Sequence, residues 1–369
     1  MKKILVAIII ILLSLNIVSI NAQSLYVSSL YTVIDNQGKF FTLNVTVSES
    51  LFGYYAGLKN PTSLDEYVTP LAVKPIADIL RTVSYSDEDF VNQVLKWNRQ
   101  HKYEITNACY PAETLYTGKG DCDTFTYLVA SVLIAGKVSD LCLITYEISA
   151  EERHMNLGVY LPEQPVDYGF RGLYWITFNN KPYYIAECTD QTKDPTRDSY
   201  KLGNMPSVLN DKEILKSVSI TNYKTDAPEQ VIAYFLNTEL TTISISATEF
   251  APTMIYPIII KGNIGVSLNN EKISLYYSHD KTKWYLAGET VTVNGDFVFS
   301  WFVLDKVDLT ARTVEFIIPE KVYIKAYWAG NTEYQGGVSE IVSSYVFPMW
   351  IVFAIIFILI LMSLNRRRK

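Results

Sequence analysis

The sequence predicts an α+β domain, in which a helix packs on a small antiparallel sheet, followed by an all-β sandwich and a C-terminal transmembrane helix. Apolar residues recur at helical spacing between residues 73 and 136, and extended runs come after them. From residue 247 to residue 344, short alternating runs are separated by turns. The stretch 345–364 then contains no charged side chain, as a membrane-spanning helix requires.

Both ends of the chain carry long apolar stretches. Residues 1–22 start with a lysine pair after the first Met, continue through an apolar run and close at Ala22, which is the layout of a secretory signal peptide. The run is long, so an uncleaved anchor stays open. Residues 345–364 can span the ~30 Å hydrocarbon layer, and the basic tail 365–369 predicts a cytoplasmic C-terminus. We therefore expect a single-pass protein of the cell membrane with its ectodomain outside.

Composition narrows the class of partner. The net charge is −6, and basic residues are not clustered outside the tail, which argues against a nucleic-acid partner. The 3 histidines are scattered, and no Cys/His pair has ligand spacing, so we expect no metal and no other cofactor. One sequon, Asn44-Val45-Thr46, is a candidate glycosylation site.

Residues 23–72 predict a small β segment ahead of the main domain. The runs 24–34 and 39–55 alternate between apolar and polar side chains. The residues between them, Asp-Asn-Gln-Gly at 35–38, are typical of a turn. We expect a pair of strands here.

Residues 73–200 predict the main domain. Ser86 is the expected N-cap of one helix, because three acidic residues follow it in the first turn. A second helix begins at Cys122, with Asp121 as its cap and Gly136 as its stop. Three extended runs follow and predict a small antiparallel sheet, at 141–149, 155–162 and 183–190.

The C-terminal half predicts a β-sandwich. Residues 201–246 are mixed and are expected to connect the two domains. Residues 247–344 contain short strands at a spacing that suggests a sandwich of immunoglobulin type. This stretch also resembles the immunoglobulin-like modules of bacteria and archaea in two groups of residues, Tyr277, Ser278, Asp280 and Trp284, then Ala326, Trp328, Gly330, Asn331 and Tyr334.

Cys122 is the candidate nucleophile. It lies in the sequence Gly-Lys-Gly-Asp-Cys-Asp-Thr, residues 118–124, at the start of the clearest helix. A cysteine reacts as its thiolate, which a helix N-terminus and a neighbouring imidazole both stabilise. The backbone N–H groups of that helix end can also hold a developing oxyanion. The flanking carboxylates oppose ionisation, so an imidazole is needed nearby.

A base for the Cys122 thiol must be one of the chain's histidines, and an acidic residue is needed to orient it. His101 lies in a polar helix end and His279 in a hairpin turn, where both are expected to be solvated. His154 comes just before an expected strand, where its ring can face a helix terminus. On the neighbouring strand, Glu187 lies among apolar residues, where a charged side chain is uncommon unless it has a partner. Asp190 lies past the end of that strand, where a carboxylate is ordinary. We therefore expect Glu187 to orient His154.

These residues resemble the transglutaminase-like superfamily. In that family a Gly-x-Cys opens a helix, a His opens a strand, and an Asp-x-Thr ends the next strand, in the same order as here. The resemblance covers residues 73–195 and implies that Cys122 is the nucleophile, His154 the base and acid, and Glu187 the orienting group. Glutamate replaces the usual aspartate, and Asn156 stands where an aromatic residue usually follows the histidine.

The expected function is that of a cell-surface thiol enzyme that hydrolyses peptide or amide bonds through an acyl-enzyme on Cys122. The same intermediate could instead be passed to an amine, which would make a protein cross-link. A third alternative is an inactive adhesion or binding module. The substrate is expected to be a protein or peptide, and the immunoglobulin-like module could contact a neighbour in the cell-surface layer. If Cys122 is free, one disulfide is possible among Cys109, Cys142 and Cys188, and the pairing stays open.

Overall fold

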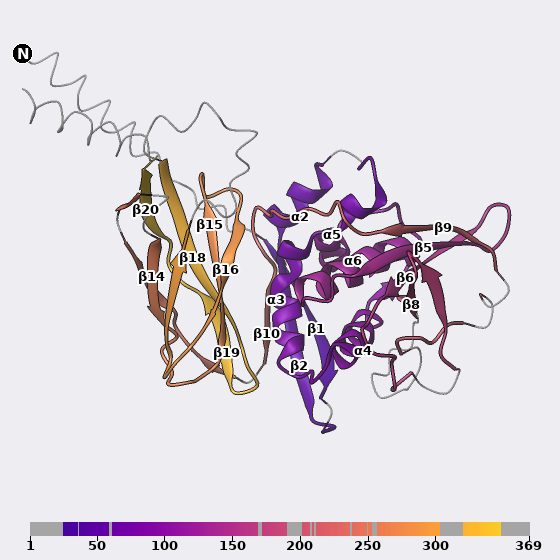
Figure 1. Ribbon diagram of the computed structural model, residues 1–369, viewed down its shortest axis with the longest axis horizontal. Helices are drawn as coiled ribbons and strands as arrows, with labels where there is room; N and C mark the ends of the chain where they lie inside the picture. Colours follow the sequence, from indigo (N-terminus) through magenta and orange to yellow (C-terminus); the bar gives the residue numbers. More distant parts are fainter. Residues whose placement is uncertain are drawn as a thin grey trace, which may run out of the picture.

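The computed structural model places two sheets and a helical layer in the first part of the chain and a β-sandwich in the second (Figure 1). Strands make up 40% of the described residues and helices 21%, so the chain is mostly β and the expected α+β fold is wrong. The structure describes residues 25–35, 37–58, 61–168, 172–189, 201–206, 209, 212–236, 238–248, 250–252, 257–302 and 320–347.

The prediction of a C-terminal transmembrane helix is also wrong. In the part of the chain that the structure describes, no helix is long and apolar enough to cross a membrane. The expected span 345–364 instead begins in extended backbone, because it overlaps β20 (Val342–Phe347), which pairs antiparallel with β18 (Glu320–Gly330). The rest of that span, the signal segment 1–22 and the basic tail 365–369 lie outside the described residues.

The first sheet joins residues that are far apart in the chain. Strands β1 (Tyr26–Ile34) and β2 (Phe40–Ser48) form a hairpin, and β10 (Ile232–Phe235) pairs with the other edge of β2. The carboxylate of Asp35 accepts hydrogen bonds from two backbone N–H groups in the turn, and Gly38 takes the positive φ that closes it. The small β segment and the connecting region thus share one sheet.

A helix begins where the sequence predicted a continuous strand. The run 39–55 stops as a strand at Ser48, whose hydroxyl accepts from Leu51 N at 3.0 Å and caps α2 (Glu49–Ala56). Glu49 lies in the first turn of this helix, where a negative charge is favourable. The local cap therefore overrides the alternating pattern after Ser48.

The helical layer packs around α6 (Cys122–Ala135). The expected caps are confirmed: Ser86 accepts from Asp89 N, and Asp121 accepts from Thr124 N. Every residue from Thr124 to Ile134 is buried, including the polar Thr126 and Ser131. Three helices pack against α6: α3 (Pro70–Arg81), α4 (Asp87–Asn98) and α5 (Pro111–Thr117). In addition, Tyr67 of the short helix η1 (Leu64–Tyr67) stacks on Tyr127.

The second sheet lies against α6 and carries the expected site residues. Its antiparallel order is β7-β8-β6-β5-β9. The three expected strands are present, the connecting region adds a fourth at one edge, and a fifth strand that was not expected forms the other edge. The bounds are β5 (Leu141–Glu147), β6 (Arg153–Val159), β7 (Trp175–Phe178), β8 (Lys181–Ala186) and β9 (Ile214–Ser219). A short parallel pair, β3 (Lys102–Tyr103) and β4 (Lys119–Gly120), leads into α6.

The C-terminal strands form two facing sheets. Isoleucines of β14 and Phe297 of β17 meet Leu275 of β15 and Ile324 of β18 in one buried core. One sheet contains β12 (Ser244–Ala247), β14 (Ile258–Asn263) and β17 (Asp296–Trp301). The other contains β18 and β20 together with β11 (Glu239–Leu240), β13 (Phe250–Pro252), β15 (Lys272–Ser278), β16 (Tyr285–Val291) and β19 (Tyr334–Val338).

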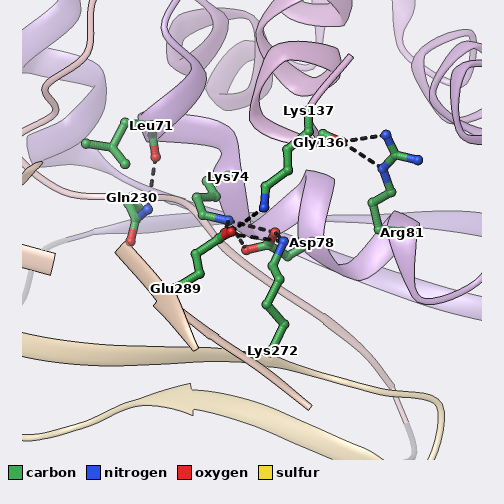
Figure 2. A network of polar contacts seen from close by, with 9 residues as sticks. All are labelled: Leu71, Lys74, Asp78, Arg81, Gly136, Lys137, Gln230, Lys272 and Glu289. Atoms are coloured by element: carbon green, nitrogen blue, oxygen red, sulfur yellow. Dashed lines mark hydrogen bonds and ion pairs between the residues drawn. The ribbon is translucent and has the colours of Figure 1, made fainter. Parts of the chain in front are cut away.

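A buried ionic network joins the sandwich to the helical layer, as Figure 2 shows. Lys74 on α3 contacts both oxygens of Asp78 at 2.8 Å and Glu289 on β16 at 3.0 Å. Lys272 on β15 lies 3.1 Å from Asp78, and Lys137, just beyond α6, lies 2.5 Å from Glu289. The side chains of Lys74 and Asp78 are each 4% exposed. The network therefore ties α3 and the end of α6 to the outer face of the sandwich.

Candidate active site

Cys122 is held at the N-terminus of α6 by a rigid cap. Asp121 accepts from Thr124 Oγ1 at 3.1 Å and from Thr106 N at 3.0 Å, and its own N–H donates to Thr124 Oγ1 at 2.7 Å. Gly120 is required before this cap, because a Cβ there would collide with Thr124 Oγ1 and would lie 2.9 Å from the Phe125 ring. The first N–H groups of a helix have no acceptor within it, so this end favours an anion.

The backbone on both sides of the site is linked by one hydroxyl. Thr126 Oγ1 donates to Cys122 O at 2.6 Å and also lies 3.3 Å from Met155 O. Met155 follows His154 on β6, so the start of α6 is fixed against the strand that carries the histidine.

His154 lies between Cys122 and Glu187. Its Nε2 is 3.1 Å from Glu187 Oε2, and Cys122 lies near enough to the ring to affect its pKa. The side chain of His154 is 18% exposed and that of Glu187 is 1% exposed, so solvent reaches the site from the histidine side.

Glu187 lies just beyond β8, and three donors surround its carboxylate. Oε1 accepts from Thr189 N at 2.8 Å and from the Thr189 hydroxyl. Oε2 faces His154 Nε2, which also lies 2.9 Å from Asn156 Oδ1. A protonated Nε2 can therefore donate to Glu187 and to Asn156. A buried carboxylate needs such partners to stay charged.

The electrostatics of the site favour a charged histidine. Burial by itself lowers the pKa of His154, but the hydrogen bonds and charges of Cys122 and Glu187 outweigh it and raise the pKa to about 10. The imidazole is therefore protonated at neutral pH. An imidazolium beside the sulfur and a helix N-terminus behind it both stabilise a thiolate.

The structure thus brings together the three residues that the sequence singled out, Cys122, His154 and Glu187. The other histidines lie elsewhere. His101 was expected to be solvated, but it is 4% exposed and its Nε2 contacts Tyr31 Oη at 2.9 Å. His279 lies edge-on to Tyr277 in the sandwich.

The remaining candidate positions lie outside this cluster. All four cysteines are free, so no pair among Cys109, Cys142 and Cys188 is bridged. Asn44 is 6% exposed on β2, the central strand of its sheet, so the sequon lies inside the sheet rather than in a surface loop. Within the described residues, no group of three or more His, Cys, Asp or Glu side chains is arranged to hold a metal ion.

Sequence reasoning missed the roles of Asn156 and Thr189. Asn156 was noted only because it departs from a family pattern, yet its position two residues after His154 puts both side chains on the same face of β6. Thr189 comes two residues after Glu187, a spacing at which a hydroxyl can reach the preceding carboxylate. Both spacings are visible in the sequence and could have suggested these contacts.

The arrangement can ionise a thiol, hold an imidazolium beside it and stabilise an oxyanion at the helix end. These are the requirements of nucleophilic catalysis by cysteine. In comparisons with models of protein families and with curated protein sequences, nothing matches this chain.

Proposed function

We propose that this chain is a thiol enzyme of the transglutaminase-like kind, which cleaves a peptide or amide bond in a protein or peptide substrate. The contact between His154 and Glu187 at 3.1 Å, with Cys122 beside the same ring, is the observation that carries the proposal. A buried carboxylate, an imidazole and a partly exposed cysteine at a helix N-terminus have few structural reasons to converge.

The reaction proceeds through a thioester. The Cys122 thiolate attacks the carbonyl carbon, and the resulting oxyanion is held by N–H groups at the start of α6. The C–N bond then breaks as the His154 imidazolium gives its proton to the leaving amine. Water attacks the thioester, His154 takes a proton from it, and the sulfur leaves as a thiolate. Glu187 keeps the ring oriented and stabilises its positive charge.

The proposal is tested by the rate at which iodoacetamide alkylates Cys122, followed by mass spectrometry of the peptide that contains it. We expect fast alkylation at pH 7 and a rate at least about tenfold lower in His154→Ala, because the ion pair is lost. His279→Ala is the matched control, since that histidine lies in the sandwich. A wild-type rate equal to that of a model thiol, unchanged in His154→Ala, would overturn the proposal.

The acceptor of the acyl group is decided by a second experiment. A glutamine peptide is incubated with the protein, with and without added amine. A mass gain of one unit from conversion of glutamine to glutamate supports hydrolysis. A mass gain equal to that of the amine less ammonia supports cross-linking by the same intermediate. If an activity-based thiol probe labels the wild type and Cys122→Ser equally, the chain is instead a binding module without this chemistry.

A further inference from the structure

Two carboxyl groups flank Cys122 at the N-terminus of α6. A hydrogen bond between Asp121 and Asp123 is one cause of the pKa shift of each, and Asp121 is 8% exposed. Among the described residues, Asp123 Oδ1 is buried and has no hydrogen-bond partner. Two ionised carboxylates at this separation repel each other strongly, and the repulsion is relieved when one proton lies between them.

The surroundings decide which of the two carries the proton. Asp121 receives hydrogen bonds from Thr106 N at 3.0 Å and from Thr124 Oγ1 at 3.1 Å, and it caps α6. These donors stabilise its negative charge. Asp123 lacks an equivalent set of side-chain donors and has one oxygen buried without a partner. The proton therefore belongs on Asp123, which donates it to Asp121.

The pKa values agree with this division. Burial raises the pKa of Asp123, and the hydrogen bond and charge of Asp121 raise it further, to about 8. Burial also opposes ionisation of Asp121, but its hydrogen bonds with Asp123, Thr106 and Thr124 outweigh burial and lower its pKa. The pair is thus singly charged at neutral pH.

The other titratable groups that face Asp123 do not change charge near pH 8. They are Tyr67 on η1, Cys109 in the loop before α5, and Tyr127 one turn further along α6. Burial raises the pKa of Cys109 to about 11 and raises those of both tyrosines above the ordinary tyrosine value. A change of charge beside Cys122 between pH 7 and 9 is therefore assigned to the carboxyl pair.

We propose that Asp123 is a positioning residue for Cys122, which remains protonated, donates its proton to Asp121, and limits the carboxyl pair to one negative charge. The inference rests on the proposed function in that the attacking thiolate and the oxyanion are both negative. A second negative charge at the start of α6 would raise the energy of each and would oppose the helix dipole. Loss of the shared proton also removes one of the hydrogen bonds to Asp121, which keeps those from Thr106 and Thr124.

The experiment compares two reagents of nearly equal size, the anion iodoacetate and the neutral iodoacetamide, at Cys122 in the full chain. The ratio of the two alkylation rates reports the local charge, because changes in sulfur reactivity cancel. We expect the ratio of iodoacetate to iodoacetamide to fall about three- to tenfold between pH 7 and 9, as one unit charge appears a few ångströms from the sulfur. The imidazolium of His154 persists in this range because its pKa is raised to about 10.

The matched variants are Asp123→Asn and Asp121→Asn. The amide of Asp123→Asn donates to Asp121 as the protonated acid does, but it cannot ionise. The ratio of the two rates should therefore stay constant from pH 7 to 9. In Asp121→Asn the carboxyl of Asp123 has no charged neighbour in the pair, so the step should move to lower pH. A wild-type ratio that stays flat between pH 7 and 9 would overturn the proposal without any variant. A step that persists in Asp123→Asn would also overturn it.

Failure of this inference can be distinguished from failure of the proposed function. In one outcome, His154→Ala slows alkylation by iodoacetamide, but the ratio of the two alkylation rates does not change between pH 7 and 9. The thiolate–imidazolium pair of Cys122 and His154 is then supported, and the shared proton is rejected. If the ratio shows the step, and Asp123→Asn removes it, while His154→Ala leaves the iodoacetamide rate unchanged, the shared proton stands and the thiol enzyme is rejected.

Discussion

The Nε2 atom of His154 and the Oε2 atom of Glu187 lie 3.1 Å apart, although 33 residues separate them in the chain. They meet because β6 and β8 are neighbouring antiparallel strands, with Leu157 opposite Ala186. Glu187 follows the last residue of β8, and His154 is near the start of β6, so both lie at the same end of these two strands.

Glu187→Gln should slow alkylation of Cys122 at pH 7 about ten- to hundredfold. The variant removes a charged hydrogen-bond partner of the imidazolium, which is worth about 1.5–3 kcal/mol, and keeps nearly the same volume. The rate is measured with iodoacetamide, and circular dichroism checks the fold. Glu187→Asp is the matched variant, because it keeps the negative charge but shortens the side chain by one methylene and so moves the carboxylate away from His154. An unchanged rate in Glu187→Gln would remove Glu187 from the site.

Asn156→Leu should slow the same reaction less, by about fivefold, because His154 Nε2 loses one acceptor and keeps Glu187. The lost hydrogen bond corresponds to about 1 kcal/mol. Thr189→Val is the paired variant, since it removes one donor from the opposite carboxylate oxygen. A rate as low as that of Glu187→Gln would contradict the view that the carboxylate, rather than the amide, is the main partner of the ring.

The stability that His154 contributes should decrease with rising pH. Its pKa is raised from 6.5 to about 10, so the folded chain binds this proton more tightly than the unfolded chain. The contribution is complete below pH 6.5 and is lost as the pH rises through about 10. We expect the difference in unfolding free energy between the wild type and His154→Ala to decrease over this range in urea titrations. A difference that increases with pH would contradict the raised pKa.

Asp78→Ala should destabilise the chain by about 1.5–3 kcal/mol, because it removes one of the two carboxylates that contact the buried amine of Lys74. The unfolding free energy is measured with urea. The control is Lys102→Gln, which removes an exposed pair with Glu104, and we expect the unfolding midpoint to stay unchanged. Equal effects of the two variants would show that the network between the helical layer and the sandwich contributes no more stability than an exposed ion pair.

Features that are encoded locally could be predicted from the sequence. Ser86 and Asp121 cap the helices that follow them, and strands β6 and β8, which place His154 and Glu187, were expected from the sequence pattern. The grouping of the three site residues followed from their order along these elements. Residue type and spacing suffice here because a cap or an alternating strand depends on a few neighbouring side chains.

Features that depend on distant partners could not be predicted. His101 is buried because Tyr31, 70 residues earlier, packs against it and contacts its ring nitrogen. The connecting region supplies β9 and β10 to two different sheets, and neither pairing is visible in its mixed pattern. The residues at 345–347 are apolar, as a membrane helix would be, but they pair as a strand with β18. In each case tertiary contacts override the local preference.

The hydroxyl of Thr126 bonds the carbonyl of Cys122 and lies against the carbonyl of the residue after His154. The gap between sulfur and imidazole is consequently set by how closely a whole helix sits on a whole sheet. A substitution that opens a cavity beneath α6 could shift the helix by a few tenths of an ångström. That shift would separate Cys122 from His154 although the chain would remain folded.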